Sequence, residues 1–200
     1  MFYFSLQIDR VTITLPPWLW SLYNSLQDKE YESKDEMIDL AIEIASQNVT
    51  ANTGGPFGTA IFERDLVTGK SKLFAVGANR VTPLNNSTLH GEMVAIQFAQ
   101  KKMQNYSLKN ASPGKEYILC TSCEPCAMCL GGTLWSGMHE MWCSATKDDA
   151  EAIGFNEGPV FAESYTQLEE AGCKVTRYLL REKGAKVLQK YGETGIIYNS

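Results

Sequence analysis

Four cysteines stand at every third position between Cys120 and Cys129, in the stretch C-T-S-C-E-P-C-A-M-C. Thiols at this spacing can ligate an iron–sulfur cluster, a structural zinc ion, or a catalytic metal ion that uses only some of them. A bacterial cluster loop has three residues before its last cysteine and a proline after it. Here the last interval is two residues, and Pro125 precedes Cys126. The cluster is therefore the weaker interpretation.

The two histidines of the chain restrict the zinc interpretation. A structural zinc site commonly joins two C-x2-C units, or one such unit and an H-x3-5-H unit, but His90 and His139 lie far apart in the sequence. H-G-E at 90–92, together with P-C-A-M-C at 125–129, instead matches the H-x-E…P-C-x-x-C signature typical of zinc deaminases that act on nucleobases. We therefore expect His90, Cys126 and Cys129 to bind one Zn²⁺ ion.

The same residues suit a catalytic rather than a structural ion. Cys126 and Cys129 lie three residues apart on a predicted helix, so they face the same way, and the start of that helix behind Pro125 favours their thiolate forms. Three protein ligands leave the fourth tetrahedral position for water, as in catalytic zinc sites. Glu92 then serves as general acid and base, which takes a proton from the water and returns protons to the ring nitrogen and the leaving amine.

Composition limits the class of protein. A chain of 200 residues with 44% hydrophobic residues predicts a single domain over 1–200, with an N-terminal extension and first helix at 1–50, a catalytic core at 51–160, and a C-terminal strand, helix and tail at 161–200. No run reaches the roughly 18 apolar residues of a membrane span, so we expect a soluble, cytoplasmic protein that does not bind membranes. Six cysteines are too few for a disulfide scaffold. A net charge of −5 without a basic stripe makes nucleic acid an unlikely partner.

The elements that must position these residues follow from local patterns. Alternation over 5–15 predicts a strand that ends at the prolines of 16–17, and S-K-D-E at 33–36 is a capping-box pattern for a helix to about Asn48. Two apolar runs, 59–64 and 73–80, predict an antiparallel hairpin. The remaining predicted elements are a helix over 90–104 capped by Ser87 or Thr88, a strand at 116–121, a helix at 126–135, a strand at 140–144, a helix at 165–171, a strand at 174–180 and a helix at 185–191. This order predicts an α/β fold, a mixed sheet with helices on both faces.

Longer motifs identify the chain by resemblance. It resembles the cytidine deaminase superfamily, in the branch of guanine deaminases and related tRNA adenosine deaminases, through G-G-P-F-G at 54–58, G-A-N-R at 77–80, T-S-C-E-P-C-A-M-C-L-G-G-T-L-W-S-G at 121–137, and D-D-A-E-A-I-G-F-N-E-G-P at 148–159. The resemblance implies a three-layer α/β/α sandwich with a mixed five-stranded sheet. It also implies a small-molecule nucleobase as substrate, and a homodimer in which the C-terminal tail can swap between subunits.

The resemblance also implies roles for particular residues. Asn79 matches the asparagine that hydrogen-bonds the base, and Phe57 and Trp135 match aromatic residues that line the base pocket. Glu157 matches an acid that acts as a second proton shuttle for the purine amine. Tyr198, in the C-terminal G-I-I-Y-N-S, matches tails that reach toward an active site of the same or the neighbouring subunit.

Two departures from the family pattern bear on the substrate. Gly91 stands where the family more often has alanine and so predicts a wider pocket beside the zinc, and the P-P-W-L-W extension at 16–20 has no assigned role. The expected reaction converts guanine to xanthine and ammonia. The alternatives are guanosine, a cytidine-type substrate or an amino-triazine such as ammeline, with tRNA adenosine last. An iron–sulfur electron carrier or a noncatalytic zinc-binding protein is the alternative from another class.

Overall fold

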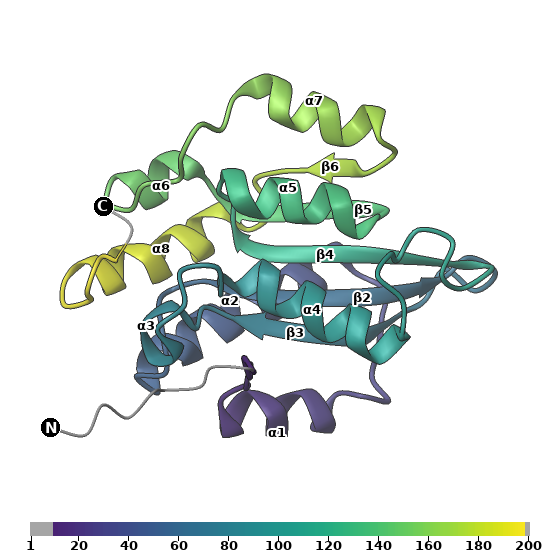
Figure 1. The fold of residues 1–200 in the computed structure, drawn as a ribbon, viewed down its shortest axis with the longest axis horizontal. Coiled ribbons are helices and arrows are strands. Elements are labelled where there is room, and N and C mark those ends of the chain that lie inside the picture. The colour runs from purple at the N-terminus through teal and green to yellow at the C-terminus, as the bar shows by residue number, and fades with distance from the viewer. Residues whose placement is uncertain (1–9, 199–200) are drawn as a thin grey trace, which may run out of the picture.

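A six-stranded mixed sheet between two layers of helices forms the centre of the computed structural model, which describes residues 10–198 (Figure 1). The strand order is β1-β3-β2-β4-β5-β6, in which β4, β5 and β6 run parallel and the other neighbours antiparallel. The strands are β1 Glu30–Tyr31, β2 Gly58–Asp65, β3 Ser71–Ala78, β4 Lys115–Cys123, β5 Glu140–Ala145 and β6 Lys174–Thr176.

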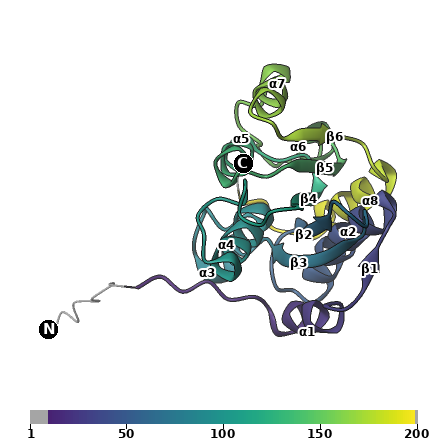
Figure 2. The ribbon, with the colours of Figure 1, turned by 90° about the vertical axis from the view of Figure 1, so that its right-hand side faces the viewer.

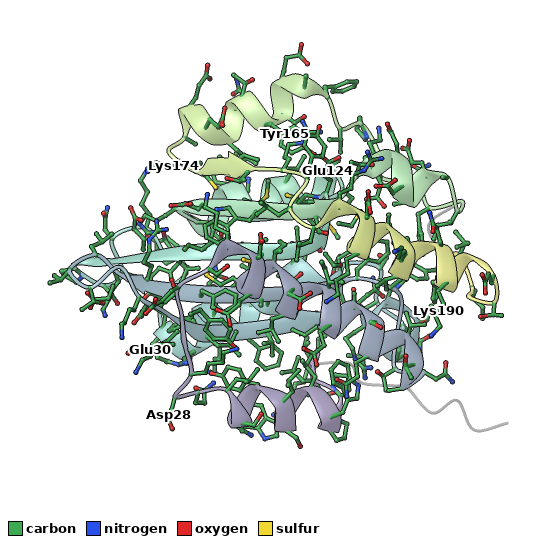
Figure 3. All side chains as sticks on the ribbon, turned by 180° about the vertical axis from the view of Figure 1, so that it is seen from behind. Asp28, Glu30, Glu124, Tyr165, Lys174 and Lys190 are labelled. Atoms are coloured by element: carbon green, nitrogen blue, oxygen red, sulfur yellow. The ribbon has the colours of Figure 1, made fainter. Side chains whose placement is uncertain are left out.

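Helices cover both faces of this sheet, which confirms the predicted three-layer sandwich. One face carries α4 and α5, and the other carries α2 and α8 (Figure 2). Figure 3 shows α1 on the side of α2, below the β3 edge. The helices are α1 Pro17–Ser25, α2 Lys34–Thr50, α3 Val81–Leu84, α4 Gly91–Met103, α5 Ala127–Ser136, α6 Lys147–Glu151, α7 Ala162–Glu170 and α8 Arg181–Gly192. No helix within residues 10–198 is both long enough and apolar enough to span a membrane.

The side chains of β2 and β4 alternate between the two faces of the sheet and so divide the core into two halves. Ile61 and Leu119 pack under α4, whereas Phe62 and Ile118 pack on the opposite face, under α2. Successive side chains of a strand point to opposite faces, so both strands are buried on both sides. The sheet centre is therefore a rigid support for the residues at its ends.

Several predicted elements are confirmed. The helix predicted after S-K-D-E is α2, where the Ser33 hydroxyl accepts a hydrogen bond from the backbone nitrogen of Asp35 at 3.2 Å. The predicted hairpin is β2 and β3, with a register shift between Ile61 and Phe62. The helices and strands predicted from 90 onward occur with shifted ends.

Other predictions were wrong. The sheet has six strands rather than five, because the two-residue strand β1 pairs with β3 and is too short to show an alternating pattern. The strand predicted over 5–15 is absent from 10–15, and its first part lies outside the described residues. Pro17 instead opens α1, since a proline at the first helical position costs no backbone hydrogen bond. His90, not Ser87 or Thr88, is the N-cap residue of α4.

Candidate metal and proton-transfer site

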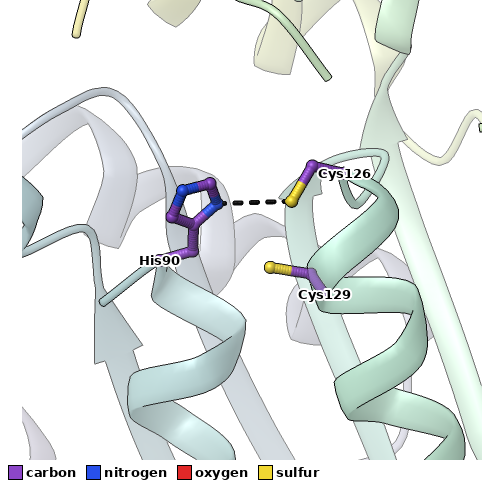
Figure 4. Close-up of side chains that lie close together, drawn as sticks. All are labelled: His90, Cys126 and Cys129. Carbon is purple, nitrogen blue, oxygen red and sulfur yellow. Dashed lines mark hydrogen bonds between the residues drawn. The ribbon is translucent and has the colours of Figure 1, made fainter. Parts of the chain in front are cut away.

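Two helix starts bring the predicted metal ligands together. His90 is the N-cap residue of α4, Cys126 is the N-cap residue of α5, and Cys129 lies in the first turn of α5. One ligand atom from each side chain lies within 4.8 Å of the other two. Nδ1 of His90 is 3.4 Å from Sγ of Cys126 (Figure 4). These three residues could therefore hold one metal ion.

The electrostatics of this group suit a cation. Hydrogen bonds to Sγ of Cys126, first from Cys129 and then from His90, outweigh burial and lower the pKa of Cys126 to about 4. A thiolate is the form of cysteine that binds metal. An imidazole and two sulfur atoms are the donor set of many tetrahedral zinc sites. The residues present therefore fit a zinc ion.

The other cysteines lie apart from this group. Cys120 and Cys123 are fully buried, and burial raises the pKa of each thiol well above its usual value. The Cys123 thiol donates a hydrogen bond to the backbone oxygen of Thr146 at 3.3 Å. Cys143 and Cys173 are buried as well, and all six thiols are free. The ladder of four cysteines thus divides into two possible ligands and two core residues.

Glu92 lies beside the metal group, in the first turn of α4, and the residue is 5% exposed. Its Oε1 accepts a hydrogen bond from the Thr121 hydroxyl at 3.0 Å, and its Oε2 lies 3.4 Å from Sγ of Cys129. Burial is the main cause that raises the pKa of Glu92. A raised pKa makes a carboxyl group hold a proton more readily, which suits a group that must return protons as a general acid.

Glu157 is the second buried carboxyl group of the site. Its backbone oxygen accepts a hydrogen bond from the nitrogen of Ala127 at 3.0 Å, which fixes the loop to the start of α5. The side chain is 7% exposed, and burial above all raises its pKa to about 8. Glu157, His90 and Cys126 line one depression of about 380 Å³. The structure thus places a carboxyl group of raised pKa in the same depression as His90 and Cys126.

Asn79 and Tyr198 present buried polar groups near these carboxyls. Oδ1 of Asn79 accepts a hydrogen bond from the nitrogen of Val81 at 3.2 Å. Its Nδ2 and the Tyr198 hydroxyl are both buried, and neither makes a hydrogen bond of regular geometry among residues 10–198, although the Asn79 side chain lies close enough to Tyr198 to act on the pKa of its hydroxyl. Tyr198 lies against Gly55, where a Cβ would overlap its ring, and both Glu157 and Glu92 contribute to raising its pKa after burial. An unpaired buried donor is costly unless a ligand satisfies it.

An aromatic wall adjoins the Tyr198 ring. Phe155 packs edge-on against Phe57, with 5.0 Å between ring centroids, and against Tyr198 at 5.1 Å. Phe57, which was predicted to line the base pocket, is half-buried in this wall. The C-terminal segment therefore closes onto the loop of 54–58 within the same chain.

The structure does not bring the other two predicted pocket residues to open space beside the metal group. Trp135, at the end of α5, is 82% exposed and lines a separate depression with Lys109 and His139. Gly91 is buried, and a Cβ there would lie 3.0 Å from Oγ1 of Thr59, so its missing side chain faces β2 rather than an open pocket. Their roles in substrate binding stay predictions.

The sequence alone missed an ion pair that anchors the loop before Cys126. Glu124 is 4% exposed, its Oε1 accepts a hydrogen bond from Nε of Arg177, and its Oε2 accepts one from the backbone nitrogen of Lys147 at 2.8 Å. The Arg177 guanidinium also lies 4.4 Å from the ring centroid of Tyr165, which Figure 3 labels with Glu124. Glu124 stands inside the cysteine motif, but no sequence pattern marks Arg177.

Comparison with known proteins decides the family. Residues 31–145 match the family model described as the cytidine and deoxycytidylate deaminase zinc-binding region. The chain belongs to this deaminase family. The deaminase is therefore an enzyme, and its family is defined by the zinc-binding region that contains His90, Cys126 and Cys129.

Similar proteins extend this result over nearly the whole chain. The deaminase is 35% identical to the guanine deaminase of Bacillus subtilis strain 168 over 130 residues, which cover 65% of this chain and 76% of that protein. A structure of guanine deaminase from Nitrosomonas europaea is 34% identical, with a TM-score of 0.81, over 92% of this chain and 97% of that one. A structure of NE0047 in complex with 2,6-diaminopurine is 36% identical, with a TM-score of 0.84, over 96% and 97%.

Proposed function

We propose that this deaminase hydrolyses guanine to xanthine and ammonia. The observation that carries the proposal is the pairing of two buried carboxyl groups of raised pKa, Glu92 and Glu157, with a His-Cys-Cys group. The similarity to guanine deaminases and to a structure with a diaminopurine supports a purine base as the substrate. In the reaction, water adds a C–O bond at C2 of the base, and the C–N bond to the exocyclic amine breaks.

The residues of the chain divide the work of this reaction. His90, Cys126 and Cys129 hold zinc, which when bound supplies a Lewis acid that makes water acidic enough to react near neutral pH. Glu92 takes a proton from the water and delivers a proton to the neighbouring ring nitrogen. Glu157 holds the proton that the leaving amine requires, because its carboxyl group stays largely protonated near pH 7.

Binding of the base falls to residues beside these carboxyls. The Asn79 amide donates its free Nδ2 hydrogen to an acceptor atom of the base, a carbonyl oxygen or a ring nitrogen. Phe57 and Phe155 form an apolar wall for the ring, and Tyr198 covers it once the base is bound. The buried polar groups then gain the partners that they lack in the free protein.

We also propose that the deaminase is a cytoplasmic, single-domain protein that forms a homodimer. The Tyr198 segment lies on its own chain in the structure. In a dimer it could lie on the same loop of the other subunit. Light scattering of the purified protein would test the dimer, since a monomer mass at micromolar concentration would contradict it.

The substrate is tested by initial rates on a panel of guanine, guanosine, cytosine, cytidine, adenine and ammeline, with ammonia release as the readout. We expect guanine to have the highest kcat/KM by at least tenfold, because each good hydrogen bond to the correct base adds about 0.5–1.5 kcal/mol of discrimination. Faster turnover of any other compound would replace guanine as the substrate.

The metal is tested by the zinc content of matched cysteine variants. We expect about one zinc per chain in the wild type, retention of zinc in Cys120→Ala, and loss of zinc in Cys126→Ala and Cys129→Ala, since only the latter two remove ligands. Iron in place of zinc, or equal loss in all three variants, would contradict the assignment.

A further inference from the structure

A chain of hydrogen bonds joins the N-terminal helix to the loop that carries Asn79. Nε1 of Trp18, in α1, donates to Oγ1 of Thr53 at 2.9 Å, and this hydroxyl donates to Oδ1 of Asn48 at 2.8 Å. Nδ2 of Asn48 donates to the backbone oxygens of Gly55 at 2.9 Å and of Asn79 at 3.0 Å. The Asn48 side chain is fully buried, and all its polar atoms are engaged.

The indole of Trp18, the first donor, fixes the direction of the whole series of hydrogen bonds. An indole N–H can only donate, so the Thr53 hydroxyl accepts from Trp18 and turns its own hydrogen toward Asn48. That hydrogen requires an oxygen, which settles the orientation of the Asn48 amide. Both Nδ2 hydrogens then point at the two backbone oxygens. With the amide reversed, three oxygen atoms would face one another without a hydrogen.

The Asn79 backbone is held on both sides by this arrangement. Its nitrogen donates to the oxygen of Phe57 at 2.9 Å, and its oxygen accepts from Asn48. Gly54 fits between them only because it has no side chain, since a Cβ there would overlap the Asn79 oxygen and lie 2.7 Å from Nδ2 of Asn48. The loops of 54–58 and 77–80 therefore behave as one unit. The Asn79 side chain, whose Nδ2 makes no hydrogen bond of regular geometry, belongs to this unit and lies near Tyr198.

We propose that Asn48 is a positioning residue that orients the Asn79 amide for the base, and that Trp18 acts through Asn48. The inference rests on the proposed function, in which Asn79 binds the substrate base. It gives the P-P-W-L-W extension a role in substrate affinity, although Trp18 touches neither the metal group nor the carboxyls. Substrate binding, rather than the chemical step, is what this network controls.

The test begins with two tryptophan variants, one that removes a hydrogen bond of this network and one that does not. Trp18→Phe removes the indole donor and keeps a ring, whereas Trp20→Phe changes a residue that is 53% exposed and stacks on Tyr23. We expect Trp18→Phe to raise KM for the base about fivefold, the size of one hydrogen bond, and to leave kcat within twofold. Trp20→Phe leaves both constants unchanged. Thr53→Val, which removes the hydroxyl, gives the same rise in KM, and Thr53→Ser restores the wild-type value.

A double-mutant cycle separates positioning from a structural role. The dissociation constant of radiolabelled base is measured by equilibrium dialysis in a Glu92→Gln background, where turnover does not interfere. If Trp18 acts through Asn79, Trp18→Phe weakens binding about fivefold when Asn79 is present and has no effect in Asn79→Ala. Equal weakening in both backgrounds, or no change in KM in Trp18→Phe and Thr53→Val, would overturn the positioning role.

The same experiment distinguishes failure of the proposed function from failure of the inference. The cycle uses whichever base of the panel the wild type deaminates. A wild type that is inactive on every base would refute the proposed function and, with it, this inference. An active wild type in which the Trp18 and Asn79 changes add independently would refute the positioning role alone.

Discussion

The two ends of the β2–β4 ladder carry polar groups in opposite electrostatic settings. At the hairpin end, Asp65 pairs with Lys115 at 2.7 Å, and Glu63 accepts a hydrogen bond from the Tyr117 hydroxyl at 2.8 Å. At the metal end, Thr121 of the same β4 strand donates to Glu92, a carboxyl group that burial keeps protonated more readily than usual.

The carboxyl groups at the two ends differ in the direction in which their pKa values are shifted. Hydrogen bonds and ion pairs with Arg64 lower the pKa of Glu116 at the hairpin end, so that carboxylate is ionised and satisfied. Burial raises the pKa of Glu92 and Glu157 at the metal end, which disfavours their charged forms. Catalytic groups need such shifted values, whereas structural charges do not. One strand pair thus carries ion-paired carboxylates at one end and, at the other, the carboxyl groups to which the proposed reaction assigns proton transfer.

The largest expected effect on kcat comes from replacing a glutamate by glutamine at the metal end, compared with the same replacement at the hairpin end. Glu92→Gln removes the proton carrier beside the metal group, so kcat should fall by about a thousandfold, while zinc content and melting temperature are retained. Glu63→Gln, which alters a carboxyl group on the hairpin side, should leave kcat within twofold. Steady-state rates and zinc analysis measure both. A Glu92→Gln variant with a tenth of wild-type activity would remove the contrast between the ends.

A smaller effect is expected from the ion pair that supports the metal end. Arg177→Met leaves buried Glu124 without its cation, so the loop before Cys126 loosens, and zinc affinity should fall about tenfold, the lower range for groups that orient metal ligands. Arg181→Met, the control, breaks an exposed pair with Asp149 and should leave zinc affinity unchanged. Competition with a chromogenic chelator measures both constants. Equal values for the two variants would make the Glu124 pair a purely structural contact.

At the hairpin end, a substitution should lower the stability of the protein and leave its activity unchanged. Arg64 pairs with both Glu116 and Glu140, and the Glu140 side chain is 10% exposed. Arg64→Met leaves these carboxylates unpaired, so the free energy of unfolding at pH 7 should fall by about 1–2 kcal/mol, between the values for exposed and buried pairs. Urea denaturation at saturating zinc measures the change. A twofold or larger drop in kcat would show that the two ends are not separate.

The decrease in the free energy of unfolding caused by Arg64→Met should also depend on pH. Because the folded pKa of Glu116 is lowered from 4.5, chiefly by hydrogen bonding to Arg64, its contribution is fully present above pH 4.5 and disappears as the pH falls through its folded value. The stability difference between wild type and Arg64→Met should therefore be constant from pH 7 to about pH 5.5 and shrink below pH 4.5. A difference that grows on acidification would assign the effect to another group.

The sequence predicted those parts of the fold that depend on local periodicity. The apolar face of α2, with its Ser33 cap, and the β2–β3 hairpin were both readable from residue spacing. The N-terminal segment was not, because alternation over 5–15 mimics a strand, and the prolines that seemed to stop it in fact begin α1. The strand β1 was missed because two residues show no period.

The candidate site was predictable to the extent that its residues share short motifs. His90, Glu92, Cys126 and Cys129 lie within two such motifs, and the structure brings them together. Arg177 could not be found, since its contact with Glu124 spans 53 residues and depends on the packing of β6 beside β5.

The low pKa of Cys126 has a practical consequence for handling the protein. A thiol with a pKa of about 4 is almost wholly in the thiolate form at neutral pH, and the thiolate is the form that reacts with alkylating agents. A preparation stripped by chelators would therefore expose one sulfur to alkylation by iodoacetamide and to peroxide, while the five other thiols stay protonated in the interior. If Cys126 binds zinc as proposed, storage with excess zinc should protect that sulfur, and the rate of its alkylation would report how much of a sample carries metal.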